Sequence, residues 1–367
     1  MAKLGEVCLL KAGKFVSAND ISPEYNKGLY PCFGGNGIRG YVADYTHDGE
    51  FPLIGRQGAL CGNVNLASGK FHATEHAVVV QPKIEMNVHW LYYALNAMNL
   101  GQYATGAAQP GLAVSKLETL SIEIPNISEQ NKIAQTLYKV EQLVNFRKQQ
   151  LAKLDELVKA RFVEMFGDLV VGNKIQTSKK KIGEIASVTK LAGFEFTKYI
   201  QYKEHGDIIM LRGLNCKQGK LILDDVKWID RETSDLLPRS KLYYGDILMT
   251  YAGTIGDVAM VDKNDKYHLA PNVAKVSINN KKAYNPIFLM YLFLYSNDYI
   301  MRFASQVAQA SINMEKIRNF EYYFPDVTFQ NQFATFVERV DQQKQTVQQS
   351  LEKLELMKKA LMQEYFG

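Results

Sequence analysis

The feature that most constrains this sequence is a repeat of its own pattern at an offset of 200 residues. When residues 129–167 are placed over residues 329–367, 14 of the 39 positions are identical without a gap. Near the start of each half, Lys3-Leu-Gly-Glu6 lies over Lys181-Ile-Gly-Glu184, at a smaller offset of 178. Self-similarity over such a distance indicates that the chain consists of two related modules.

The two halves match near their ends and differ in their middles. Residues 109–116 lie over 309–316, and Asn87-Val-His-Trp lies over Asn285-Pro-Ile-Phe, whereas residues 30–42 have no clear counterpart. The second half also holds about 20 more residues in this region. Duplicated frames with divergent middles predict two related domains that recognise two different targets.

Each half ends in a long segment that predicts a long helix. The positions spaced by three and four residues from Ile133 to Met165 are apolar at eight of ten places, and so are those from Phe333 to Tyr365. This is the pattern of a coiled-coil seam, so we expect the two helices to pair with each other, the alternative being two helices that each pack on their own domain. Ser128 and Thr328 are the predicted N-caps. The basic exceptions in the seams are Arg147, Arg161, Lys344 and Lys358.

The remaining sequence predicts strand-rich globular parts. Short strands are expected at 51–54, 76–80, 246–250 and 258–261, and helices near 87–99 and 285–297, the second capped by Asn285 with Pro286 at its first position. The predicted fold class is therefore α+β, with two mixed, strand-rich domains and an internal pseudo-two-fold repeat. The expected divisions are domains at 1–125 and 181–325, long helices at 126–167 and 326–367, and a linker at 168–180.

Composition excludes several classes of protein. The four cysteines, at positions 8, 32, 61 and 216, occur singly, which argues against a zinc ribbon and against a disulfide scaffold. No signal-peptide pattern stands at the N-terminus, and the longest apolar run, Ile287–Tyr295, is half of a membrane span. We therefore expect a soluble, cytoplasmic protein that does not contact a membrane. A net charge of +5 neither requires nor excludes binding to nucleic acid.

Two motifs suggest ligand chemistry, but their contexts do not support it. Gly35-Asn-Gly37-Ile-Arg-Gly40 matches a dinucleotide-binding pattern, yet strand-like sequence follows it and Asn36-Gly37 is a hairpin-turn signal. His72 and His76 stand in strand-like sequence without the pattern of a helical zinc site. No nucleophile, base and orienting group occur together. The sequence therefore predicts no catalytic residue, cofactor site or metal site in this chain.

What remains is a set of polar residues, mostly next to glycines, at similar places in both halves. Arg forms paired hydrogen bonds with guanine, and Asn or Gln with adenine, in the major groove of DNA. The alternative for each residue is an ordinary turn or surface position. The candidate DNA-binding residues are Asn36, Arg39, Arg56, Gln57 and His72 in the first half, and Arg212, Asn215, Lys217, Tyr251, Thr254 and Asn272 in the second.

At this point the sequence resembles the specificity subunits of type I restriction–modification systems. The resemblance covers essentially the whole chain, and its duplicated order is more specific than any single motif. The segments that carry it are Tyr30-Pro-Cys-Phe-Gly-Gly-Asn-Gly-Ile-Arg-Gly-Tyr41, Pro52-Leu-Ile-Gly-Arg-Gln-Gly58, Cys61-Gly-Asn63, Leu211-Arg-Gly-Leu-Asn215 and Gly245-Asp-Ile-Leu-Met-Thr-Tyr-Ala-Gly-Thr-Ile-Gly256.

This resemblance implies two target-recognition domains, each reading one half of a bipartite site in double-stranded DNA. The long helices would pair antiparallel and act as a spacer. Two modification (methyltransferase) subunits, which bind S-adenosylmethionine and flip the target adenine, would dock on the chain, and restriction subunits would join them. This chain would then be a non-catalytic subunit without a cofactor of its own. The competing hypotheses are a self-contained DNA methyltransferase and a coiled-coil scaffold with no role on DNA.

Overall fold

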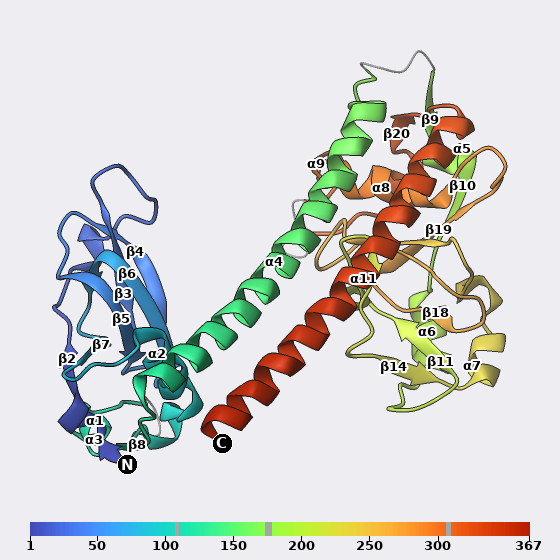
Figure 1. The fold of residues 1–367 in the computed structure, drawn as a ribbon. Helices are drawn as coiled ribbons and strands as arrows, with labels where there is room; N and C mark the ends of the chain where they lie inside the picture. The colour runs from blue at the N-terminus through green and yellow to red at the C-terminus, as the bar shows by residue number, and fades with distance from the viewer. Residues whose placement is uncertain (107–109, 173–177, 306–309) are drawn as a thin grey trace. The chain divides into compact units, whose positions relative to one another are not determined.

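The computed structural model describes residues 1–106, 110–172, 178–305 and 310–367 (Figure 1). It divides into two compact units. Unit 1 contains Met1–Gln150 and Val347–Gly367, and unit 2 contains Leu151–Thr346. Each unit therefore combines one strand-rich part with a stretch of each long helix.

Unit 1 is built on a six-stranded sheet in the order β2-β7-β5-β6-β3-β4. Helix α2 (Val88–Ala97) packs on β5 and β6. The strands of the sheet are β2 (Cys8–Ala12), β3 (Tyr30–Gly34), β4 (Gly37–Val42), β5 (His47–Gly55), β6 (Val64–Ala73) and β7 (Ala77–Pro82). The smaller elements are β1 (Ala2–Lys3), α1 (Leu4–Val7), α3 (Val114–Glu118) and β8 (Ser121–Ile122), with 3₁₀ turns at Ala18–Asp20 and Leu100–Tyr103.

Unit 2 repeats the first four strands of that order and then departs from it. Its four-stranded sheet, β10-β19-β16-β17, matches β2-β7-β5-β6, and a second sheet runs β14-β11-β18-β15. The first sheet contains β10 (Ala186–Lys190), β19 (Val273–Ile278), β16 (Ile247–Thr250) and β17 (Val258–Met260). The second contains β14 (Lys227–Ile229), β11 (Ile208–Leu211), β18 (Tyr267–Leu269) and β15 (Lys241–Leu242), and β12 (Cys216–Lys217) pairs with β13 (Lys220–Leu221).

The remaining elements of unit 2 include one more pair of strands with a counterpart in unit 1. A two-stranded ribbon of β9 (Lys179–Lys181) and β20 (Glu321–Tyr323) corresponds to β1 and β8 of unit 1. The helices are α5 (Ile182–Ile185), α6 (Gly193–Tyr199), α7 (Arg231–Asp235), α8 (Pro286–Tyr295), α9 (Asn297–Met301) and α10 (Met314–Arg318), with 3₁₀ turns at Gly213–Asn215 and Pro238–Ser240. The α+β class, the expected strands and the two expected helices are confirmed.

Helices α4 (Ile127–Phe166) and α11 (Val327–Phe366) each contain 40 residues. In unit 1, Lys358 Nζ lies 2.7 Å from Glu141 Oε1, and Lys148 Nζ lies 2.9 Å from Glu355 Oε1. Residue numbers rise along α4 as they fall along α11, so the helices pair antiparallel. In unit 2, Lys344 lies 2.6 Å from Asp155 and Arg161 lies over the ring of Phe336, so residue numbers again rise along α4 as they fall along α11.

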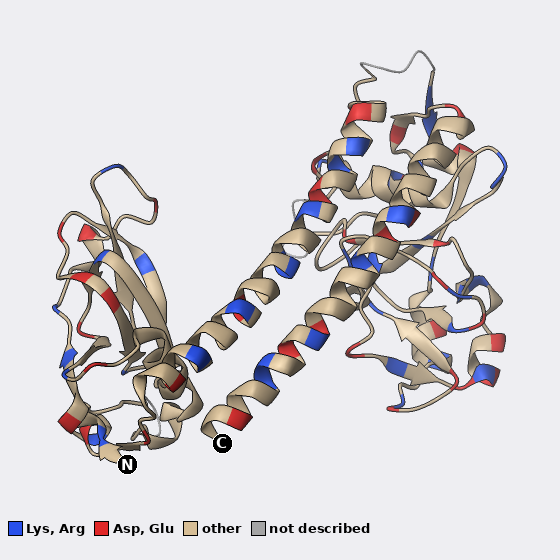
Figure 2. Cartoon of the chain, in the orientation of Figure 1, with Lys and Arg blue, Asp and Glu red and all other residues tan. Residues whose placement is uncertain are grey.

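Basic and acidic residues are interspersed along both helices (Figure 2). Each of the four basic residues that interrupt the apolar seams contacts a residue of the other long helix. Lys358 and Lys344 each meet a carboxylate of α4, and Arg147 Nε donates to Ser350 Oγ at 3.2 Å. Arg161 lies over the ring of Phe336. Antiparallel pairing thus places opposite charges, rather than like charges, across the seam.

The predicted N-caps of the long helices are wrong by two residues. Helix α4 begins at Ile127, and the N–H of Glu129 donates to Asn126 Oδ1 at 3.0 Å. Helix α11 begins at Val327, and the N–H of Thr328 donates to Asp326 Oδ1 at 2.8 Å. Asn and Asp cap helices as well as Ser does, and these two residues precede the predicted caps, so the helices start earlier.

A buried glutamine joins each long helix to its globular part. Gln130 Nε2 donates to the carbonyl of Pro125 at 2.9 Å, and its Oε1 accepts from the N–H of Asn87 at 2.9 Å. Asn87 Nδ2 donates to Asn131 Oδ1 at 2.7 Å. The same bonds join Gln330, Pro325, Asn285 and Asn331 in unit 2. Both residues of the Gln-Asn pair form hydrogen bonds between the long helix and the globular part in each unit, which explains why the repeat retains them.

The expected hairpin is present: Gly35 and Asn36 form the turn between β3 and β4, and Gly37 begins β4 with a φ of 96°. Asn285 caps α8 as expected. Of the predicted linker at 168–180, residues 173–177 lie outside the described residues, as do Gln109 and Gln309. Residues 168–172 belong to unit 2, where Leu169 is buried in the core. Among the described residues, none of the helices is both long enough and apolar enough to span a membrane.

Candidate nucleic-acid interface

The loop that follows β5 holds the best-placed candidates of unit 1. The N–H of Arg56 donates to the carbonyl of His76 at 3.0 Å, and the carbonyl of Arg56 accepts from the N–H of Leu112 at 2.9 Å. The chain then turns through Gly58 and Gly62, which have φ angles of 87° and 89° that favour glycine. The backbone at residue 56 is therefore fixed on both sides, and its side chain projects from a defined point.

The loop that follows β16 repeats this geometry in unit 2 with different side chains. The N–H of Tyr251 donates to the carbonyl of Asn272 at 3.0 Å, and the carbonyl of Tyr251 accepts from the N–H of Ile312 at 2.9 Å. Tyr251 is thus the counterpart of the arginine at position 56, and Asn272 is the counterpart of the histidine at position 76. The two units present different functional groups from one shared backbone frame.

In unit 1, the β3–β4 turn meets the loop after β5. Asn63 Nδ2 donates to Asn36 Oδ1 at 2.6 Å. Gly55 packs directly on Gly35. A Cβ atom on residue 55 would lie 1.9 Å from the carbonyl oxygen of Gly35, so only glycine fits at position 55. Asn36 and Gln57 are exposed and Arg56 is half-buried. The structure therefore brings these three candidates to the same edge of unit 1. The Nε atom of Arg56 is buried and has no hydrogen-bond partner among the described residues.

Two candidates of unit 1 lie elsewhere. Arg39 is exposed on β4. His72 is a correction: it lies within β6, opposite Cys32 of β3, and it is buried, with its Nε2 atom 3.2 Å from the carbonyl oxygen of Lys14. Only 8% of its surface is exposed, so little of this side chain is accessible to DNA. Among the described residues there is also no group of three or more His, Cys, Asp and Glu side chains that could hold a metal ion.

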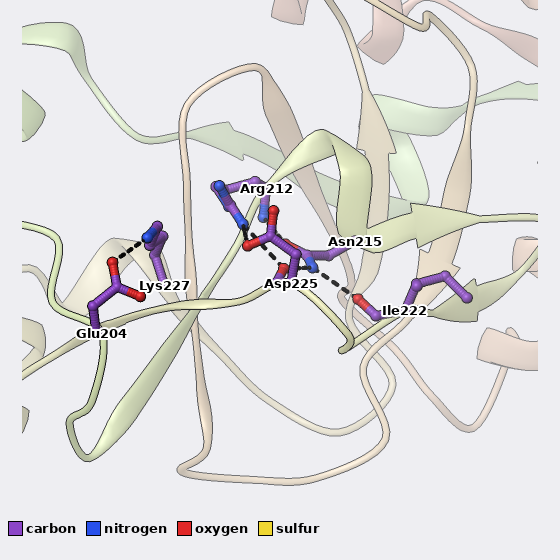
Figure 3. Close-up of polar contacts among 6 residues, drawn as sticks. All are labelled: Glu204, Arg212, Asn215, Ile222, Asp225 and Lys227. Atoms are coloured by element: carbon purple, nitrogen blue, oxygen red, sulfur yellow. Dashed lines mark hydrogen bonds and ion pairs between the residues drawn. The ribbon is translucent and has the colours of Figure 1, made fainter. Parts of the chain in front are cut away.

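Three candidates of unit 2 follow β11, where Arg212 and Asn215 belong to one hydrogen-bonded cluster (Figure 3). Arg212 Nη2 donates to Asp225 Oδ1 at 2.8 Å and to the carbonyl of Asp225 at 3.0 Å. Lys227 forms an ion pair with Glu204 nearby, and this hydrogen bond lowers the pKa of the Glu204 carboxyl group. The third candidate, Lys217, is exposed on β12.

The prediction that Asn215 contacts DNA is the second one that the structure corrects. It is fully buried, and its Nδ2 atom donates to the carbonyl oxygens of Ile222 and Asp225, at 2.7 and 2.8 Å. Its Oδ1 atom accepts from the N–H of Arg212 at 3.0 Å. With these bonds made and no exposed surface, the amide holds the turn and is not placed to read a base.

The other three candidates of unit 2 gather at the end of β16. Thr254 and Asn272 are exposed, and Tyr251 is half-buried, with its Oη atom accepting from the N–H of Asn272 at 3.3 Å. Lys190 Nζ lies 5.5 Å from the centre of the Tyr251 ring. Sequence reasoning did not select Lys190, because its proximity to Tyr251 depends on pairing between β10 and β19.

The halves of the repeat both match one known family. The family model for the type I restriction modification DNA specificity domain matches residues 1–156 and again residues 176–356. The EcoprrI type I restriction enzyme specificity subunit of Escherichia coli is 53% identical over 143 residues, which are 39% of this chain and 36% of that protein. The putative specificity subunit S.HindORF215P of Haemophilus influenzae is 26% identical over 264 residues, 67% of this chain and 64% of that protein. The matched region is therefore less than two thirds of either relative.

Solved structures show the same fold. A type I restriction-modification system S subunit from M. genitalium superposes with a TM-score of 0.65 at 17% identity, over all of this chain and 95% of the other. A second chain comes from a structure that describes complex assembly and conformational transition of the type I R-M system. It gives a TM-score of 0.58 at 13% identity, over all of this chain and 96% of the other. The family model and the solved structures therefore point to the same family of specificity subunits.

Proposed function

Since the chain belongs to the type I restriction–modification DNA specificity family, we propose that it binds double-stranded DNA and reads one half of a bipartite site with each unit. The observation that carries this proposal is the correspondence between Arg56 and Tyr251. One backbone frame, built twice, presents an arginine in one unit and a tyrosine in the other. Two readers with different side chains at one position would select two different half-sites.

The residues at each strand end have the chemistry that such reading requires. Arg56 carries a planar fork of donors suited to the O6 and N7 atoms of guanine, and Asn36 and Gln57 beside it carry amides suited to adenine. In unit 2, Tyr251, Thr254 and Asn272 offer hydroxyl and amide groups, and Lys190 supplies a positive charge for a phosphate. The ion pair with Asp225 partly neutralises the charge of Arg212, so we assign Arg212 a smaller contribution to DNA binding.

The chain acts, in this proposal, as the non-catalytic subunit of a larger cytoplasmic complex. Two modification subunits, with S-adenosylmethionine bound to them, would carry out methyl transfer, and restriction subunits would join where the host has them. The support is the family membership together with the lack of any grouped nucleophile, base and orienting residue in the sequence.

The test is to replace residues 181–325 with the matching part of a relative and to sequence the methylated motifs of cells that also express the modification subunit. We expect one half of the motif to change and the other half to remain. A change in both halves would contradict the modular assignment. Donor binding by the chain alone would favour a self-contained methyltransferase, and failure of the assembled complex to bind any duplex would favour a scaffold.

A further inference from the structure

The turn between β6 and β7 meets the other two loops at the strand-end edge of unit 1. It contains Glu75 and His76, and the carbonyl of His76 accepts from the N–H of Arg56. A Cβ atom on Gly35 would lie 3.3 Å from the carbonyl oxygen of His76 and 3.4 Å from that of Gln57. Three segments that are distant in sequence therefore converge at Gly35: the β3–β4 turn, the loop after β5 and the β6–β7 turn.

The carboxylate of Glu75 is held at one oxygen and unpaired at the other. Its Oε1 atom lies 3.1 Å from His76 Nε2. Its Oε2 atom is buried and has no hydrogen-bond partner among the described residues, and the same is true of Arg56 Nε and His76 Nδ1. Buried polar atoms are nearly always paired in folded proteins, so each of these atoms needs a partner from outside the chain.

The chemistry of a carboxylate limits what the partner of Glu75 can be. An ionised carboxylate only accepts hydrogen bonds, and its charge repels the phosphates of DNA. The donors that bases present in the major groove are the N4 amino group of cytosine and the N6 amino group of adenine. Adenine also presents its N7 acceptor beside N6, whereas cytosine presents no acceptor there. Cytosine is therefore the base that fits a side chain that only accepts.

We propose that Glu75 is a specificity-determining residue of unit 1, and that its Oε2 atom accepts from the N4 amino group of a cytosine in the half-site that unit 1 reads. This inference rests on the proposed function, because it assigns one base contact within it. Arg56 beside Glu75 is suited to guanine, so the two side chains together suit G·C base pairs. A thymine at the same position would bring its O4 acceptor against the carboxylate and would be rejected.

The repeat assigns this carboxylate to one half-site only. Asn272 is the counterpart of His76, so the counterpart of Glu75 is Pro271, whose side chain has no polar atom. The same backbone frame therefore presents a side-chain acceptor at this place in unit 1 and none in unit 2. We expect substitution of Glu75 to change how unit 1 reads its half-site and to leave the half-site of unit 2 as it was.

The test uses the assembled complex of this chain with its modification subunits. Sequencing of the methylated motif gives the site, and the exchange of residues 181–325 shows which half unit 1 reads. The probes are duplexes in which each C·G pair of that half is replaced in turn by T·A. At one position we expect the wild-type complex to prefer cytosine by about tenfold or more. Glu75→Gln should lose this preference, because its amide can also donate to O4 of thymine.

The matched control is Glu85→Gln, which removes the same charge from an exposed residue of unit 1 and should keep the preference for cytosine. A second variant, Glu75→Ala, should lose the preference without gaining affinity for thymine. The proposal is overturned by an unchanged preference in the folded Glu75 variants, by an equal loss in Glu85→Gln, by a uniform loss across all duplexes, or by a half-site without a C·G pair. Failure of the wild-type complex to bind any duplex would instead overturn the proposed function.

Discussion

Lys358 of α11 binds Glu141 of α4 across the helix pair of unit 1, and the same carboxylate accepts a hydrogen bond from the hydroxyl of Tyr93 on α2. The two distances are 2.7 and 2.9 Å. Glu141 therefore ties both long helices to the globular part of unit 1. Burial and the nearby Glu141 charge raise the pKa of Tyr93, so its hydroxyl stays protonated and remains a donor.

We expect Glu141→Ala to destabilise the protein by about 2 kcal/mol, because it leaves Lys358 and Tyr93 without their acceptor. The matched control is Glu156→Ala, which removes an exposed pair with Lys153 on the same helix and should cost less than about 0.5 kcal/mol. Urea unfolding followed by circular dichroism measures both. Equal losses in the two variants would show that Glu141 has no special role.

Arg56→Ala should weaken DNA binding by about 1–3 kcal/mol if the guanidinium forms a paired contact with guanine. Arg56→Lys keeps the charge and loses the fork, so it should lose much of the discrimination while retaining binding. The measurement is the affinity of the assembled complex for its site and for single-base variants of one half-site. A uniform loss across all duplexes would instead place the arginine on a phosphate.

Asn215→Ala should lower stability by about 2–3 kcal/mol, because it removes the three hydrogen bonds that the buried amide makes with the carbonyls of Ile222 and Asp225 and with the N–H of Arg212. Asn36→Ala removes an exposed turn residue and should change stability little. On DNA the order should reverse, with Asn36→Ala weakening the complex more than a folded Asn215→Ala protein does. Thermal unfolding and DNA titration of both variants provide the check, and a stable Asn215→Ala protein with lost specificity would contradict the assignment.

If the paired helices set the spacing between the two half-sites, seven residues inserted into each helix should add about 10 Å, because the seam phase is kept. At 3.4 Å per base pair, the unspecified spacer of the methylated motif should grow by about three pairs while the half-sites stay the same. Four residues inserted into one helix should disrupt the seam and weaken assembly. Motif sequencing in cells reports both, and an unchanged spacer in an active seven-residue variant would reject the hypothesis.

His268 makes unit 2 sensitive to acid. Burial lowers the pKa of its imidazole below the usual 6.5, so the unfolded chain takes up the proton at a higher pH than the folded chain does. Its contribution to stability is full above pH 6.5 and is lost as the pH falls below that value. We expect the melting temperature of the wild-type protein to fall more steeply than that of His268→Gln between about pH 7 and 5. Parallel curves would contradict this.

The sequence by itself determined the features that depend on local periodicity and on duplication. The seam from Ile133 to Met165 predicts its helix because apolar residues at spacings of three and four can face a partner only as a helix. Asn36-Gly37 predicts its hairpin because glycine readily adopts the positive φ, 96°, with which Gly37 begins β4. The N-caps failed by two residues because Asn126 and Ser128 are both good caps, and local sequence does not rank them.

Only the tertiary structure decided which polar residues remain accessible and which positions correspond between the units. His72 and Asn215 have the same side-chain chemistry as good candidates, but both are buried in the folded units. Arg56 and Tyr251 share no sequence pattern, and the loops after them differ in length by one residue. Their equivalence rests on hydrogen bonds to residues 20 or more positions away. Such bonds form only when the sheet assembles, because the partners of a backbone group at a strand end are chosen by the packing of the whole unit.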